Sequence, residues 1–173
     1  IHTIHLDDST EHLYINGSNI AGGGLVVADV SDPWNPSYLG QEAGAYVHDG
    51  YVRNDTCYSG AMFLGQLRII DFTNKSNPVV LGSVTTPGSF THNTWLTDDG
   101  KTCLTTDEVN GAYLTAYDVS DFGNITELDR IQTNVGQGTS AIHNVEIIND
   151  YAVNAWYKDC LLYTSPSPRD SRV

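Results

Sequence analysis

Short apolar runs alternate with polar turns along most of the chain. Three segments share one order, which is an apolar strand, an aspartate, a short polar turn and a second strand. They read GLVVADVSDPWNPSYLG at 24–40, QLRIIDFTNKSNPVVLG at 66–82 and YLTAYDVSDFGNITELD at 113–129. Such runs, joined by Asp, Asn, Gly and Pro, predict paired β-strands.

A second pair of strands precedes each of these segments. It begins with a histidine, continues as a short strand, turns at an acidic or Asn-Asp tip and returns as a strand. The aligned histidines are His2, His48, His92 and His143. One unit is therefore four short strands in about 45 residues, which is the length of a propeller blade. A single blade cannot bury both of its faces, so blades must stack around an axis.

These repeats predict an all-β chain, a β-propeller fragment of about three and a half four-stranded blades. The repeats lie at about 1–46, 47–90 and 91–141, with a partial repeat at 142–159. The chain begins at Ile1 within a strand-like pattern. We therefore expect it to be an arc of a larger ring, whose partners include the remaining blades of the same full-length chain.

The last segment, CLLYTSPSPRDSRV at 160–173, differs in composition from the rest. Residues 160–170 are similar to the translation of a common transposase-type sequencing adapter, codon by codon. We therefore interpret 160–173 as a non-native, disordered tail, although a Pro/Ser-rich linker is an alternative.

The composition and charge narrow the classes of partner. The chain has 173 residues, 16 of them glycine and 10 tyrosine, and 40% are hydrophobic, which is typical of a globular β protein. Its formal net charge of −13 argues against nucleic acid and anionic membranes, which require a basic surface. Cations, glycans and proteins with a basic face remain open as partners. No apolar run of about 18 residues is present, so we expect no transmembrane segment.

The aspartates that end three of the strands are Asp29, Asp71 and Asp118. Each can accept hydrogen bonds from backbone N–H groups just beyond its strand, and this predicts a structural turn. The same residues could contribute oxygens to a calcium site. No bidentate glutamate follows at a loop-like spacing, which favours the turn.

The four aligned histidines are the candidates for chemistry. If the first strand of each blade is innermost, the histidines surround one mouth of the central channel. The loop after the second strand would bring Asp107 and Glu108 to His92. Imidazoles with carboxylates can bind a divalent metal ion such as zinc, manganese or iron. The candidate metal ligands are His48, His92, His143, Asp107 and Glu108; the wider candidate ligand-binding set is His2, His48, Asp49, His92, Asn93, His143 and Asn144.

A purely structural role for the histidines is the alternative, because packing bonds recur in every blade whereas a catalytic group is needed once. His5 and His12 have no counterparts, and we expect them at surface or packing positions.

Cys57 and Cys103 are at equivalent positions of neighbouring units, too far apart for a disulfide, so they predict two free buried thiols. No nucleophile or phosphate-loop motif is present, and catalytic residues stay unassigned.

Three pentapeptides, at 25–29, 67–71 and 114–118, resemble the LVIVD repeat. Together with YVHDGYVRNDT, FTHNTWLTDDGK and TTDEVNGAY, they resemble the choice-of-anchor B family of secreted or surface-attached bacterial β-propeller proteins. The resemblance covers 1–159. It implies a propeller fold and an extracellular or cell-surface location, and it implies no particular reaction.

Two functions follow as hypotheses. The first is a non-catalytic binding module that takes a protein, a glycan, a small polar ligand or a metal ion at the histidine-bearing mouth. The second is a metal-dependent hydrolase or lyase, with His48, His92 and His143 as ligands and Asp107 or Glu108 as ligand or general base.

Overall fold

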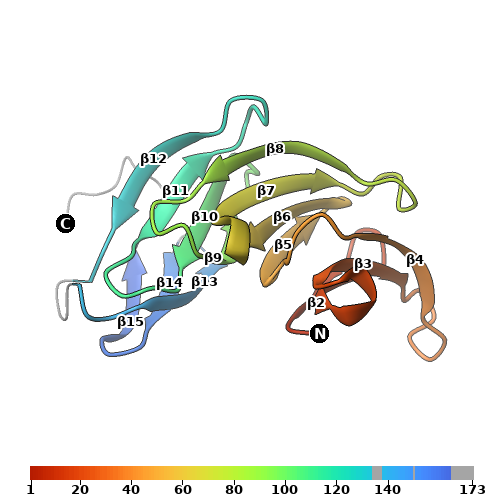
Figure 1. Cartoon of the computed structure of the whole chain (residues 1–173), viewed down its shortest axis with the longest axis horizontal. Coiled ribbons are helices and arrows are strands. Elements are labelled where there is room, and N and C mark those ends of the chain that lie inside the picture. Colours follow the sequence, from red (N-terminus) through yellow and green to blue (C-terminus); the bar gives the residue numbers. More distant parts are fainter. Residues whose placement is uncertain (134–137, 150, 165–173) are drawn as a thin grey trace.

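The computed structural model describes residues 1–133, 138–149 and 151–164. It confirms the all-β, propeller-like architecture. The chain forms four antiparallel sheets, three with four strands and one with three. Figure 1 shows the sheets side by side in chain order, from the red strands of the first to the blue strands of the last. Among the described residues no helix is long and apolar enough to cross a membrane.

Each sheet is a simple meander of consecutive strands. The first contains β1 (Ile4–Asp7), β2 (His12–Ser18), β3 (Gly24–Asp29) and β4 (Ser37–Glu42). The second contains β5 (Asp49–Arg53), β6 (Thr56–Ala61), β7 (Gln66–Asp71) and β8 (Val79–Thr85). The third contains β9 (Thr91–Leu96), β10 (Thr102–Asp107), β11 (Leu114–Asp118) and β12 (Thr126–Ile131), and the fourth contains β13 (Ile142–Ile148), β14 (Tyr151–Trp156) and β15 (Cys160–Thr164). Short 3-10 turns follow β2 (η1, Asn19–Ala21) and β6 (η2, Met62–Leu64).

The sequence repeat also appears in the backbone register. The pairing of the third strand with the fourth shifts at Val27/Ala28, Ile69/Ile70 and Ala116/Tyr117. These positions are equivalent in the three repeats, and each lies just before the aspartate that ends the strand. A β-bulge at a fixed position bends each sheet in the same way. The three repeats therefore have one shape, which allows them to stack.

The cores lie between sheets, as stacking requires. One cluster joins Tyr14, Leu25 and Val27 of the first sheet to Ile70 and neighbouring residues of the second. A second cluster joins the second and third sheets, and a third joins the third and fourth. No sheet has a core of its own, so each blade is stabilised by apolar area that its neighbour covers.

Cys57 and Cys103 lie in two different inter-sheet cores. Both thiols are free and buried, as the sequence predicted. Burial raises the pKa of each thiol above its usual range, because a thiolate is unfavourable in apolar surroundings.

The strand β15 lies in residues that the sequence analysis assigned to a disordered tail. Its backbone pairs with β14, from Trp156 with Cys160 to Ala152 with Thr164. The open edge of β14 offers unpaired N–H and C=O groups, and the sequence CLLYT has the apolar character of a strand. Disorder is therefore not found at 160–164, and 165–173 lie outside the described residues. The non-native origin of the tail stays a prediction.

Candidate functional site

The four aligned histidines lie in one row across the four sheets. The ring centroids of His2 and His48 are 3.6 Å apart, those of His48 and His92 are 4.1 Å apart, and those of His92 and His143 are 4.5 Å apart. Each histidine belongs to the start of its sheet's first strand or precedes it by one or two residues. The sequence register therefore places one imidazole from every blade in a continuous row, which we call the histidine row.

Neighbouring blades hold the backbone of this row in place. Nδ1 of His2 lies 3.0 Å from the carbonyl oxygen of His48. The hydroxyl of Thr106 donates a hydrogen bond of 2.6 Å to the carbonyl oxygen of His143. The first bond is an inter-blade contact of the kind that a structural role predicts, so the ring of His2 has that role; the second involves only the backbone of His143.

Burial keeps the central rings neutral. His92 is 2% exposed and His48 is 8% exposed, whereas His2 is exposed and His143 is half-buried. Burial and the neighbouring His48 lower the pKa of His92 to about 4, although Glu108 opposes the shift. Burial, followed by His2, also lowers the pKa of His48. Neutral imidazoles have a free lone pair, which is the form that binds metal ions.

Two ring nitrogens in the row are unpaired. Within the described residues, the buried Nδ1 atoms of His48 and His92 have no hydrogen-bond partner. Buried polar atoms in proteins are nearly always paired, so a water molecule or a ligand is expected at these two nitrogens.

Three side chains at one end of the row form a candidate metal centre. His92, Glu108 and His143 each offer a ligand atom, and these atoms lie within 4.8 Å of one another. Nε2 of His92 is 3.2 Å from Oε2 of Glu108. The other carboxylate oxygen, Oε1, accepts a hydrogen bond from the hydroxyl of Tyr157. Two imidazoles and one carboxylate form a donor set typical of zinc, with Tyr157 orienting the carboxylate.

Asp107 does not join this centre, contrary to the expectation from the sequence. It is fully buried, and its two carboxylate oxygens accept hydrogen bonds from Thr86, Gly88 and Phe90. Adjacent residues of an extended chain point to opposite sides, so Asp107 and Glu108 cannot both face the histidines. Asp107 instead holds the loop before β9. His48 lies in the row but outside the group of three donors.

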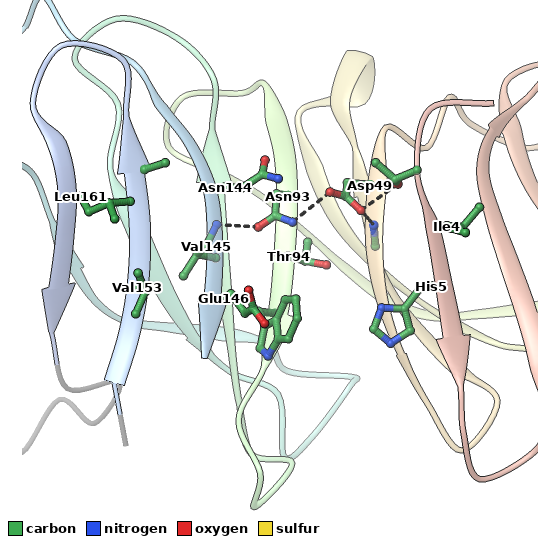
Figure 2. Close-up of a pocket in the computed structure, with 14 residues that line it drawn as sticks. Ile4, His5, Asp49, Asn93, Thr94, Asn144, Val145, Glu146, Val153 and Leu161 are labelled. Atoms are coloured by element: carbon green, nitrogen blue, oxygen red, sulfur yellow. Dashed lines mark hydrogen bonds between the residues drawn. The ribbon is translucent and has the colours of Figure 1, made fainter. Parts of the chain in front are cut away.

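The residues that follow the histidines form a second polar layer. Asp49 accepts hydrogen bonds from the hydroxyl of Thr3 at 2.9 Å and from the amide of Asn93 at 3.0 Å. Asn93 in turn accepts one from the backbone N–H of Val145 at 2.9 Å. Figure 2 shows the chain of bonds through Asp49, Asn93 and Val145. Asp49 and Asn93 therefore bind neighbouring blades, while Asn144 is exposed.

A pocket of about 380 Å³ lies beyond this layer. Its lining includes His5, Trp95 and Glu146, which sequence reasoning did not select. Each lies three positions after an aligned histidine, and Tyr51 has the same position in the second sheet. That spacing was visible in the sequence and could have identified the set. His5, which we expected to be a surface or packing residue, lines the pocket.

The strand-ending aspartates form the turns described above. Asp29 accepts a hydrogen bond from the backbone N–H of Ser31 at 2.8 Å, and Asp71 accepts one from Thr73 at 2.7 Å. Asp118 accepts one from Ser120 at 2.9 Å. In each of the three repeats, the aspartate accepts a hydrogen bond from the backbone N–H two residues further on. This is the bond of a short turn, so these aspartates have a structural role.

Comparison of the sequence with protein families identifies the LVIVD repeat at residues 16–41 and 61–86. Each match spans the end of a sheet's second strand, its whole third strand and most or all of its fourth. The chain therefore contains LVIVD repeats at two of the three positions that the pattern of apolar residues indicated, and the copy at 114–118 is not matched. The comparison with curated proteins gave no match.

Solved structures with a similar fold are propeller-like proteins. The periplasmic gluconolactonase of Pseudomonas aeruginosa has a TM-score of 0.70 at 14% identity, covering 94% of this chain and 52% of its own. A protein from Lactobacillus plantarum has a TM-score of 0.70 at 11% identity, with the same coverage. The computationally designed Ika4 protein has a TM-score of 0.64 at 12% identity, covering 94% of this chain and 91% of its own. At this identity the likeness shows the fold alone, and the chain spans about half the length of the two natural proteins.

Proposed function

We propose that the chain is part of a secreted or cell-surface β-propeller that acts as a non-catalytic binding module and holds a divalent metal ion at the histidine row. One observation carries the proposal, namely that donor atoms of His92, Glu108 and His143 lie within 4.8 Å of one another. Zinc lies about 2.0–2.2 Å from nitrogen and oxygen ligands. Two ligands at this distance from a tetrahedral ion are about 3.4 Å apart, so the side chains would have to close by up to about 1.4 Å to hold the ion, which rotation about their side-chain bonds can provide.

The surroundings support a metal ion rather than an anionic ligand. The lowered pKa of His92 keeps its ring uncharged at neutral pH, so no proton has to leave before a metal binds. Glu108 contributes negative charge, and the whole chain has a net charge of −13. Both features attract a cation and repel anions such as phosphates.

Elemental analysis after zinc loading and desalting tests this function. We expect about one zinc per chain, and we expect the His143→Gln and Glu108→Gln variants to lose it. The His12→Gln variant is the matched control, since His12 is remote from the donors, and it should keep the metal. The proposal would be rejected if the wild-type protein retained no zinc after loading and desalting. It would also be rejected if a folded His143→Gln variant retained stoichiometric zinc.

The location outside the cytoplasm rests on the resemblance to secreted and surface-attached propellers. The gluconolactonase of similar fold is periplasmic in its own organism, which is consistent with export. Fractionation of cells that express the full-length protein tests this part. Recovery only in the cytosolic fraction would contradict it.

A metal-dependent hydrolase or lyase is the second candidate function. The observation in its favour is the number of donors, because three protein ligands leave a coordination position open for water or substrate. The fold is also that of a gluconolactonase. Incubation of the zinc-loaded protein with gluconolactone should then produce acid faster than the metal-free protein does. Equal rates would leave the non-catalytic binding module as the function.

A further inference from the structure

The pocket beyond the histidine row is a separate feature of the first strands of the sheets. It is lined by residues of β1, β5, β9 and β13, which are the first strands of the four sheets, together with β14 and β15. In Figure 2 the side chains of His5, Asp49, Asn93 and Glu146 surround it. Its volume of about 380 Å³ is at the small end of the range for small-molecule sites. None of the three donors of the candidate metal centre lines it.

Aromatic rings form one side of this pocket. The ring centroids of His5 and Trp95 are 6.3 Å apart, and Tyr51 lies behind them at 4.8 Å from His5 and 5.1 Å from Trp95. Arg53 fixes Tyr51 by a hydrogen bond of 2.8 Å to the phenol oxygen, and its guanidinium also donates to the carbonyl of Thr97 at 2.9 Å. Tyr51 is therefore held in place against both rings, and Trp95 lines the pocket.

The charge of the pocket is negative. Its lining contains the carboxylates of Asp49 and Glu146 and, among the residues that the structure describes, no lysine or arginine. Glu146 is exposed, and within the described part of the chain its carboxylate has no hydrogen bond or ion pair. His5 does not offset this charge, since burial lowers the pKa of its ring. These two carboxylates repel an anion and attract a cation.

We propose that this pocket binds a small organic cation, an ammonium group carried on a short apolar chain. The face of Trp95 attracts a cation through its quadrupole, and Glu146 adds a direct Coulomb attraction. Ile4, Val145 and Val153 supply apolar surface for the rest of the ligand. Aromatic rings are the groups that proteins use to recognise quaternary ammonium ions, and the carboxylates add a charge of the opposite sign.

Titration of the whole chain with three probes tests the proposal. Choline is the cation, 3,3-dimethylbutanol is its neutral isostere and gluconate is an anion of similar size. Indole fluorescence and the amide NMR signals of β9 and β13 report binding. We expect choline to bind at least about fivefold more tightly than dimethylbutanol, and gluconate to show no binding.

Variants locate the site. Glu146→Gln should weaken choline binding by roughly three- to fivefold, and Trp95→Leu should weaken it by about tenfold. Glu11→Gln is the matched control, because it removes the same charge from an exposed glutamate outside the pocket, and it should bind as the wild type does. Equal affinity for choline and dimethylbutanol, or choline binding unchanged by Glu146→Gln, would overturn the proposal. These outcomes do not depend on zinc, so they are separable from the metal test.

Discussion

Nε2 of His92 lies 3.2 Å from Oε2 of Glu108, across the first hairpin of the third sheet. His92 is in β9, and Glu108 directly follows β10, which pairs with β9. The histidine recurs in every sheet, but the glutamate does not, because the residues that follow the equivalent strands are Asn19 and Met62. The third sheet therefore differs chemically from its neighbours at this one point.

The hydroxyl of Tyr157 should affect the metal affinity without being a ligand. It donates a hydrogen bond to Glu108, and its ring lies 5.5 Å from that of His143. Loss of such an orienting bond weakens metal binding by about tenfold or more. We expect this loss in a zinc titration of Tyr157→Phe, while Tyr151→Phe, at an exposed position, should bind as the wild type does. Equal affinities for both variants would mean that Glu108 needs no such support.

The buried histidines should make the metal-free protein less stable in mild acid. The pKa of His92 falls from 6.5 to about 4 on folding, so between these values only the unfolded chain binds the proton. The free energy of unfolding should therefore decrease as the pH falls from about 6.5 towards 4. Urea denaturation in the presence of a chelator measures it. His92→Gln should show a flatter dependence, and an unchanged slope would refute the low pKa.

Gly60 should be intolerant of a side chain. A Cβ atom at Gly60 would lie 2.9 Å from the carbonyl oxygens of both Thr91 and His92, which is closer than van der Waals contact allows. Because these atoms are backbone, β9 would have to move. We expect Gly60→Ala to lower the free energy of unfolding by about 1–3 kcal/mol and to weaken zinc binding. Gly123→Ala, in an exposed turn, is the control for the loss of a glycine.

Asp55 should be important for the contact between the first two sheets. His12 and Tyr14 each lie 2.9 Å from its Oδ1, and Lys75 lies 2.7 Å from its Oδ2. Burial alone would raise the pKa of Asp55, but these bonds outweigh burial and hold the pKa below its usual range. We expect Asp55→Asn to cost about 2–3 kcal/mol in chemical denaturation. Asp98→Asn, at a position 95% exposed, should cost almost nothing.

The repeat made most of the fold predictable from the sequence. Blade length, the strand-ending aspartates and the four histidines all recur at fixed spacing, so one physical argument places every copy. The histidine row followed from this register without any knowledge of three-dimensional contacts. The free, separate thiols of Cys57 and Cys103 followed from the same register.

The features that occur once were harder to predict. Asp107 and Glu108 look equivalent in the sequence, but the strand directs one into the loop at Thr86 and the other towards the histidines. The register shift between Thr106 and Asp107 adds to this change of direction, and no residue type indicates it. The aromatic side of the pocket was hard to predict for a different reason. His5, Tyr51 and Trp95 occupy equivalent positions in their sheets but are different residue types, so no repeated residue marks them.

The hydrogen-bond chain from Thr3 through Asp49 and Asn93 to Val145 connects all four sheets. In stacked repeats each unit contacts only its neighbours, and arrays of this kind can fray from their ends. Here a single side chain, Asn93, both donates to the sheet before it and accepts from the sheet after it. Fraying of the fourth sheet would leave a buried amide oxygen unpaired in the third. The arc should therefore open as one cooperative unit, and hydrogen exchange of its central amides should give one common free energy of opening.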